Sequence, residues 1–439
     1  MPEDKTYAAD PLVVQSDLRA APDDLPAAEL GGWRQTFRAL RHRNFRLFCF
    51  GQIVSLCGTW MQSVAQNWLL YRLTHSEFLV GLNYFCLQMP VFALGPLGGL
   101  AADRLSRRRV IVVCQTLLMV QALALWLLVF SGHVKWQYVM VLAVAQGCIN
   151  AFDMPARQAF VIEMAGREDL LNAISLNSSL FNAARVLGPA IAGVLVYRLG
   201  EALCFLINGL SFGPVIAALL MMRLPPFRPP ESVSPWEHLL EGYRYAYRTV
   251  HIRYLLMMLS ANTLAGMGAL VLMPFFADAI LGRGSRGFGI LLAAMGVGAL
   301  IGTLVLASRG TQRGLVRVIL LGADGLGVSL ILLAISRNFY FSIAVMVLLG
   351  FSTLRQLAAT NTLIQTVIPD QYRGRIMSLY TMTVVGLGPF GSLATGALAA
   401  RAGAPIAVAV GGVVSLAAAL IFRSRLAVFE RSIQQETPA

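Results

Sequence analysis

The chain has 439 residues, of which 57% are hydrophobic and only 13% are charged. Soluble proteins carry about 25% charged residues, so this composition excludes an ordinary soluble protein and indicates one built for a lipid bilayer. The net charge of +13 does not indicate a nucleic-acid partner, because the arginines lie in short connections between apolar segments and no aromatic-basic stripe suited to stacking on bases is present.

The first 44 residues are polar and rich in proline, alanine and aspartate. No short apolar stretch with a small-residue cleavage site follows them, so a cleaved secretion signal is not expected. We predict that residues 1–44 form a disordered cytoplasmic tail, whose basic end from Arg38 to Arg46 meets the membrane surface.

Twelve apolar segments follow, each long enough to cross a hydrocarbon core of about 30 Å as a helix. Their expected limits are 45–71, 78–103, 108–130, 136–157, 170–198, 202–222, 253–278, 287–308, 316–336, 339–362, 375–400 and 405–422. The sequence therefore predicts an all-α membrane protein with twelve transmembrane helices. All six cysteines lie inside these segments without a CxxC pair, which favours buried apolar thiols over a metal site or disulfides.

The basic residues indicate how the helices are oriented. If the N-terminus is cytoplasmic, the connections, tails and span ends on that side hold 26 of the 35 lysines and arginines, and the opposite side holds seven. The other two, Arg185 and Arg355, lie within spans. Because positive charge accumulates in cytoplasmic loops, this bias predicts that both termini are cytoplasmic.

The longest connection, 223–252, opens on a proline-rich stretch that cannot continue a helix. It is predicted to be a cytoplasmic loop between two six-helix halves, 45–222 and 253–422. A cytoplasmic tail is expected at 423–439.

The two halves share weak sequence repeats. At an offset of 203 residues, Gly188 recurs as Gly391 and Gly193 recurs as Gly396. We therefore predict a duplicated, pseudo-symmetric fold with a substrate site between the halves, near the middle of the membrane.

A glycine- and arginine-rich loop connects the second and third spans. Its sequence, Gly-Leu-Ala-Ala-Asp-Arg-Leu-Ser-Arg-Arg-Arg over 99–109, resembles the signature loop of the major facilitator superfamily, glycine-x-x-x-aspartate-arginine-x-glycine-x-arginine-arginine. Gly98 and Gly99 would let the spans pack closely. The resemblance implies a gate that latches the cytoplasmic side, with Gly99, Asp103, Arg104, Arg107 and Arg108 as its residues. The alternative is a basic topology loop in which Asp103 only neutralises charge.

Three further segments resemble one branch of that superfamily, the exporters that include the enterobactin exporter. They are 151–160 at the end of the fourth span, 177–185 in the fifth, and 361–375 between the tenth and eleventh. The resemblance covers roughly 43–425. It implies a twelve-helix, alternating-access carrier that moves small molecules outward with a proton gradient, without identifying the substrate.

The fifth span contains Gly-Pro-Ala-Ile-Ala-Gly over 188–193, which resembles a motif of antiporters in the superfamily. Proline removes a backbone hydrogen bond and small residues allow close approach, so Gly188, Pro189 and Gly193 would let this helix bend. Ordinary small-residue packing is the alternative.

Four polar residues share one face of the fourth span. Gln146, Asn150, Asp153 and Arg157 occur at i, i+4, i+7 and i+11. Asp153 and Arg157 lie one turn apart and can neutralise each other, so this face is either a proton-coupling site or a structural ion pair. Asp324, in the ninth span, is a further proton-coupling candidate with packing as its alternative.

Other polar residues within the spans either line a substrate cavity or hold helices together. The cavity candidates, with Gln146 and Asn150, are Gln62 and Gln66 in the first span, Asn262 in the seventh, and the cations Arg185 and Arg355, which can attract an anionic substrate.

The chain lacks the residues of an ATP-driven pump or of a membrane enzyme. Its two lysines, Lys5 and Lys135, complete no GxxxxGK[ST] loop, and its five histidines show no metal-ligand or nucleophile-base pattern. We therefore predict a monomeric secondary active transporter of a bacterial inner membrane, without cofactor or metal, that exports siderophore- or drug-like small molecules in exchange for protons. Import of a small metabolite and a non-transporting sensor on the same fold are the alternatives.

Overall fold

The computed structural model describes residues 37–166, 168–222, 246–247, 249–308, 314–426 and 428–429. Within them, twelve helices are long and apolar enough to cross a membrane, as predicted, and no strand is present. Most of the predicted N-terminal tail (1–36), most of the central loop (223–245) and the end of the C-terminal tail (430–439) lie outside the described residues.

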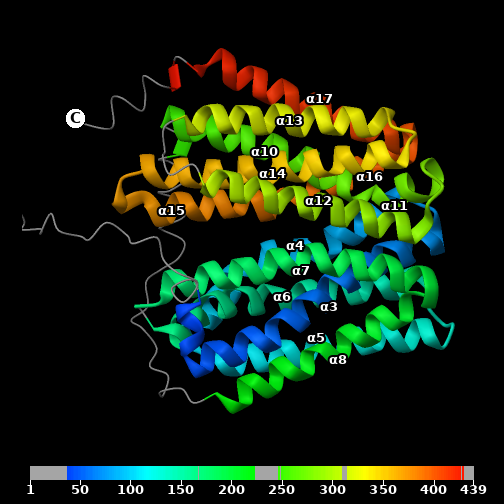
Figure 1. Ribbon diagram of the computed structural model, residues 1–439, viewed down its shortest axis with the longest axis vertical. Helices are drawn as coiled ribbons and strands as arrows, with labels where there is room; N and C mark the ends of the chain where they lie inside the picture. The colour runs from blue at the N-terminus through cyan, green and yellow to red at the C-terminus, as the bar shows by residue number, and fades with distance from the viewer. Residues whose placement is uncertain are drawn as a thin grey trace, which may run out of the picture.

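The N-terminal half is a six-helix bundle that forms the lower part of Figure 1. A short 3-10 helix, η1 (Arg38–Arg41), precedes it. The six helices are α3 (Arg43–Thr74), α4 (Glu77–Arg104), α5 (Arg107–Phe130), α6 (Trp136–Ala165), α7 (Leu170–Leu199) and α8 (Glu201–Met221).

The C-terminal half forms the upper bundle of Figure 1. Its elements are α10 (Val250–Val271), α11 (Met273–Phe275), η2 (Phe276–Ile280), α12 (Gly284–Ala307), α13 (Leu315–Ile335), α14 (Phe339–Val367), α15 (Asp370–Thr381), η3 (Met382–Gly386), α16 (Gly388–Ala402) and α17 (Ala404–Ser424).

Two predicted spans are interrupted rather than continuous. The span expected at 253–278 consists of α10, α11 and η2, and the span expected at 375–400 lies within α15, η3 and α16. After each break a helix begins with a proline in its first turn, Pro274 or Pro389, where a missing backbone N–H is tolerated. The elements η2 and η3 are π-helical turns, which are wider than α-helical ones.

The helices run back and forth between the two ends of the molecule. One end of the molecule, which we call the tail face, contains η1 and the end of α17. It also includes the connections 105–106 and 166–169. The other end, the opposite face, includes the connections 131–135 and 336–338. Here Asn338 caps α14 by accepting hydrogen bonds from the backbone of Tyr340 and Phe341, at 2.9 and 3.1 Å.

The two halves come close together at two pairs of glycines. A β-carbon on Gly193 of α7 would lie 2.7 Å from the α-carbon of Gly289 in α12. A β-carbon on Gly81 of α4 would lie 3.3 Å from the α-carbon of Gly396 in α16. Since Gly193 and Gly396 are separated by the repeat offset of 203 residues, the same position in each half forms a crossing with the other half.

Aromatic side chains extend these crossings. The rings of three pairs lie within 4.6 to 6.2 Å of each other, centroid to centroid: Tyr71 with Phe275, Phe85 with Phe390, and Trp68 with Phe288. These pairs lie between the middle of the helices and the opposite face. The halves are therefore closed against each other on the opposite face.

The glycine crossing gives a first testable prediction. We expect Gly193→Ala to lower the apparent midpoint of thermal unfolding in detergent, because the added methyl group forces α7 away from α12 at a cost of roughly 1–3 kcal/mol. The matched control is Gly95→Ala in α4, where a β-carbon meets nothing within 4 Å. Alanine favours helices over glycine by about 1 kcal/mol, so this control should keep or raise the midpoint. Equal midpoints for the two variants would contradict the tight crossing.

Candidate functional site

A pocket at mid-helix depth is lined mainly by the C-terminal half and by one residue of the N-terminal half. The N-terminal half contributes Arg185 from α7, and the C-terminal half contributes residues of α10, α12, α13, α14 and η3. Asn262, Thr263, Thr353 and Gln356 are polar members of its lining, and the remainder is mainly leucine and methionine. Of the predicted cavity residues, Arg185 and Asn262 therefore line this pocket.

Gln62 and Gln146 lie instead in an amide network inside the N-terminal half. The Gln62 side chain donates hydrogen bonds to Gln121 at 3.0 Å and to Gln146 at 3.5 Å, and accepts one from Asn208 at 2.7 Å. All four amides are at least 95% buried. The network joins α3, α5, α6 and α8, so it stabilises the bundle, and a role of these glutamines in substrate contact stays a prediction.

Three other cavity candidates are also absent from the pocket lining. Gln66 is buried and donates to Asn83 of α4 at 3.0 Å. Asn150 is half-buried on α6. The guanidinium of Arg355 lies 5.3 Å from the ring centroid of Phe351, on its own helix α14.

The two carboxylates considered for proton coupling are both paired. Asp153 is 1% exposed, accepts a hydrogen bond from Gln115 at 2.9 Å and forms an ion pair with Arg157. It lies between α5 and α6, within one half. Asp324 of α13 pairs with Arg423 at the end of α17, at 2.6 Å.

The predicted gate loop is fixed to its own half. Arg107 pairs with Glu163 of α6 at 2.7 Å, and Arg108 donates to the backbone carbonyl of Leu220 at 2.7 Å. The Asp103 side chain is 62% exposed, and its ion pair among the described residues is a long one, 3.9 Å to Arg107. The latch is therefore not engaged with the other half in this structure.

The close packing beside this loop depends on Gly98 and not on Gly99. A β-carbon on Gly98 would lie 1.9 Å from the carbonyl oxygen of Ala151 in α6, whereas one on Gly99 would meet nothing within 4 Å. The expectation that both glycines allow close approach was therefore wrong for Gly99, which faces away from α6. Arg104, the remaining residue of the motif, is exposed at the end of α4.

The antiporter-like motif of α7, residues 188–193, packs against two other helices, α3 and α12. A β-carbon on Gly188 would lie 2.5 Å from Cβ of Trp60 in α3, while Gly193 forms the crossing with α12. Pro189 lies inside α7, which continues unbroken from Leu170 to Leu199. The role of the motif in exchange stays a prediction.

A polar contact across the halves was missed from the sequence. The Tyr71 hydroxyl, at the end of α3, donates to the carboxylate of Asp278 in η2 at 2.6 Å. The two residues are 207 positions apart. Each residue lies at the end of an apolar segment, where polar and aromatic side chains are common. Nothing in the local sequence therefore predicts that these two residues make contact. This contact joins the halves at the opposite face.

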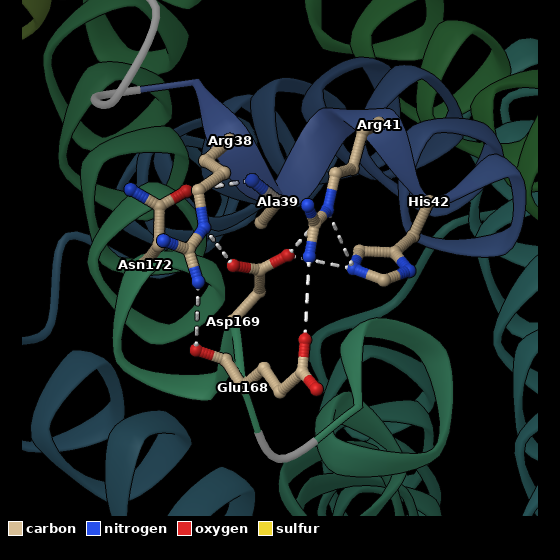
Figure 2. Close-up of polar contacts among 7 residues, drawn as sticks. All are labelled: Arg38, Ala39, Arg41, His42, Glu168, Asp169 and Asn172. Atoms are coloured by element: carbon tan, nitrogen blue, oxygen red, sulfur yellow. Dashed lines mark hydrogen bonds and ion pairs between the residues drawn. The ribbon is translucent and has the colours of Figure 1, made fainter.

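A second missed cluster lies at the tail face. Asp169, just before α7, pairs with Arg38, with Arg41 at 2.8 Å and with His42 at 2.7 Å. Figure 2 shows these side chains converging on one carboxylate, with Asn172 bonded to the backbone of η1. The basic side chains expected to meet the membrane surface thus hold η1 against the connection between α6 and α7.

The environment of Asp169 favours its ionised form. Burial opposes ionisation, but hydrogen bonds from Arg38 and His42 and the positive charges of Arg38 and Arg41 outweigh it. The pKa of the Asp169 carboxyl therefore lies below its usual value of 3.8.

Comparison with known proteins identifies the family. The model of the transmembrane secretion effector family matches residues 34–438, which is nearly the whole chain. The chain belongs to this family. Transmembrane secretion effectors of this type are transporters of the major facilitator superfamily, and the protein is accordingly a multi-pass membrane transporter.

The relatives of this secretion effector include transporters with named substrates. The chain is 23% identical to the staphyloferrin A transporter of Staphylococcus aureus, with 79% of this chain and 87% of that one aligned. It is 26% identical to the multidrug efflux pump Tap of Mycolicibacterium fortuitum (81% and 89%) and 26% identical to the enterobactin exporter EntS of Shigella flexneri (82% and 86%). The crystal structure of the nucleoside transporter NupG has the same fold, with a TM-score of 0.70 at 12% identity over 87% of this chain and 99% of that one.

The Tyr71–Asp278 contact gives a second prediction. Hydrogen bonds to charged groups contribute about 1.5–3 kcal/mol, so Tyr71→Phe should increase opening of the opposite face roughly ten- to a hundredfold. The measurement is the labelling rate of Ala277→Cys, a fully buried site, by a water-soluble maleimide in a cysteine-free background. Tyr340→Phe, at a ring that is 73% exposed, is the control and should leave the rate unchanged. An unchanged rate in Tyr71→Phe would show that the contact does not hold the face closed.

The pKa of Asp169 gives a third prediction. A carboxyl with a lowered pKa stabilises the contact fully above its ordinary pKa of 3.8, and this stabilisation is lost as the pH falls through the lower folded value. We expect hydrogen-exchange protection of residues 38–42 to be lost in Asp169→Asn at neutral pH. In the unmodified protein, the hydrogen-exchange protection that Asp169 gives to residues 38–42 should persist down to about pH 4.

Glu168→Gln is the matched control for the Asp169 variant. The Glu168 side chain is 85% exposed, and its carboxylate lies 3.6 Å from Arg41. Its backbone carbonyl, which accepts a hydrogen bond from Arg38 at 3.4 Å, is unchanged in the glutamine variant. Equal loss of protection in both variants would mean that Asp169 has no special role in holding η1.

Proposed function

We propose that this transporter exports siderophore- or drug-like small molecules across a bacterial inner membrane in exchange for protons, by alternating access. The observation that carries the proposal is the pocket at mid-helix depth, lined by both halves and placed below a closed opposite face. A carrier of this fold transports by closing one face of such a pocket and opening the other. One chain supplies both sides of the pocket, so the working unit is a monomer.

The tail face is the cytoplasmic face in this proposal. The support is the distribution of basic residues, 26 on the tail-face side against seven on the opposite side. Both chain termini would then be cytoplasmic. The conformation closed at the opposite face, with Asp103 disengaged, corresponds to the state in which an exporter takes up its substrate from the cytoplasm.

The charged loop at 99–109 would latch the cytoplasmic face in the alternate state. Arg107 and Arg108 already anchor the loop to α6 and α8, so the exposed Asp103 carboxylate is held at the edge of its own half. Closure of this face would bring a helix end of the other half within reach of Asp103, where a carboxylate stabilises a helix N-terminus.

The proton gradient is the proposed energy source, and Asp153 is its proposed site of action. The buried ion pair with Arg157 gives the carboxylate two states: ionised and paired, or separated and protonated. The hydrogen bond from Gln115 connects Asp153 to α5, so a rearrangement of α5 and α6 would change both interactions together. Asp324 is the second candidate, although its partner Arg423 is half exposed to solvent.

Export is supported by the relatives as well as by the glycine-proline motif in α7. Enterobactin and staphyloferrin A are the compounds named for two of them, and Tap is described as a multidrug efflux pump. These compounds serve as probes, and the substrate of this chain is proposed only as a molecule of that general type.

A flux experiment tests the proposal and gives the fourth prediction. In proteoliposomes with an acidic lumen, the unmodified protein should accumulate labelled enterobactin or staphyloferrin A against its gradient while the lumen loses acidity. We expect Asp153→Asn to abolish this uphill accumulation, because a neutral amide cannot carry a proton, and to leave binding of the probe intact. Asp324→Asn, which removes the other paired carboxylate, tests the second candidate in the same assay and should keep most of the flux if Asp153 is the proton site.

Two outcomes would overturn the proposal. If collapse of the pH gradient leaves accumulation by the unmodified protein unchanged, or neither probe accumulates, proton-driven export of this substrate type is wrong. If Asp153→Asn accumulates substrate at the unmodified rate, Asp153 is only a structural partner of Arg157.

A further inference from the structure

Arg185 lies inside α7 without an acidic partner among the described residues, unlike Arg157 and Arg107. Arg157 pairs with Asp153, and Arg107 pairs with Glu163. Among the described residues, by contrast, no carboxylate lies within 4.0 Å of the Arg185 guanidinium. A cation within the membrane is energetically costly unless something neutralises or solvates it.

Arg185 lies in the middle of α7, where aromatic rings hold it in place. Its guanidinium lies 5.7 Å from the ring centroid of Trp60 in α3, a cation–π distance. Trp60 in turn packs edge-to-face on Phe181, one turn before Arg185, at 5.6 Å. The rings orient the guanidinium without removing its charge or its hydrogen-bond donors, so the position is prepared for an anion.

The other half presents two buried amides to the same pocket. Asn262 of α10 is 5% exposed and Gln356 of α14 is 3% exposed, and the amide nitrogen of each has no hydrogen-bond partner. A buried amide without a partner destabilises the protein by roughly 1–3 kcal/mol. The Asn262 oxygen already accepts a hydrogen bond from Ser415 at 2.7 Å, so its amide nitrogen is the group that is left to donate to a polar ligand, and Arg185 favours a negative charge on that ligand.

The remainder of the pocket is apolar. Met267 and Met295 are among its lining residues, and Met267 also contacts the Tyr84 hydroxyl of the N-terminal half at 3.5 Å. Methionine side chains adapt to ligands of irregular shape. The ligand should therefore combine one anionic, oxygen-bearing group with an apolar body.

We propose that the pocket binds an organic anion whose acid group pairs with Arg185 and bonds to Gln356 and Asn262, while its apolar body lies against the methionines. The proposal rests on the proposed function in taking the pocket as the transport site. It adds the charge of the substrate and the residue that recognises this charge. Such a ligand bridges the two halves, because Arg185 belongs to one and both amides belong to the other.

Equilibrium binding of a matched pair of compounds tests the proposal. The probes are radiolabelled 2-naphthoate and 2-naphthamide, which share an apolar body and differ in charge, and the protein is the full chain in detergent. We expect naphthoate to bind about ten- to a hundredfold more tightly than naphthamide. Arg185→Gln should remove this preference, and Arg185→Lys should keep part of it because the positive charge remains.

Arg198→Gln is the matched control, since it removes the same charge from the exposed end of the same helix. It should leave the preference unchanged. Gln356→Met is a second variant in case Arg185→Gln fails to fold; it should weaken naphthoate binding several-fold while the charge preference persists. Equal binding of both probes, binding of neither, or a preference that survives in Arg185→Gln would overturn the proposal.

The outcome is independent of the flux experiment. A preference for naphthoate that depends on Arg185, without proton-driven flux, would reject the proposed export mechanism and leave the anion site standing. Proton-driven flux with no charge preference in the binding experiment would support the export mechanism and reject the anion site.

Discussion

The close contact between backbones at the two glycine crossings is the constraint on which the rest of this structure depends. In a bilayer, helices gain nothing from burying apolar side chains against each other instead of against lipid, so association relies on packing and polar contacts. The crossings at Gly193–Gly289 and Gly81–Gly396 bring four helices close enough for the neighbouring rings to meet. At the opposite face, the Tyr71 hydroxyl donates to Asp278 at 2.6 Å and adds a polar contact between the halves.

The two halves share a close glycine contact between helices but differ in their buried polar contacts. In the N-terminal half, a buried amide network centred on Gln62 and the Asp153–Arg157 pair connect neighbouring helices. In the C-terminal half, α12 and α14 meet through glycines: β-carbons on Gly298 and Gly350 would each lie 1.9 Å from a carbonyl oxygen of the other helix. The N-terminal half has the corresponding contact, because a β-carbon on Gly98 of α4 would lie 1.9 Å from the carbonyl oxygen of Ala151 in α6, so both bundles contain the same kind of glycine crossing.

The sequence predicted the number and type of the helices well, because apolar length is a local property that the bilayer enforces. The repeat offset of 203 residues also marked the positions that became the crossings. Contacts between distant segments could not be predicted in this way. Neighbouring Gly98 and Gly99 look alike in the sequence, yet only one faces α6. Arg185 and Arg355 likewise appear equivalent as cations within spans, and only the fold shows which of them lines the pocket.

The widened turn η3 has a consequence for how the C-terminal half tolerates change in length. A π-helical turn contains one more residue than an α-helical turn, and each residue of an α-helix advances the side-chain direction by about 100°. The number of residues in η3 therefore sets the direction in which each side chain of α16 points. Loss of a single residue there would turn Gly396 away from Gly81 without altering either glycine, so this short segment should accept substitutions far more readily than insertions or deletions.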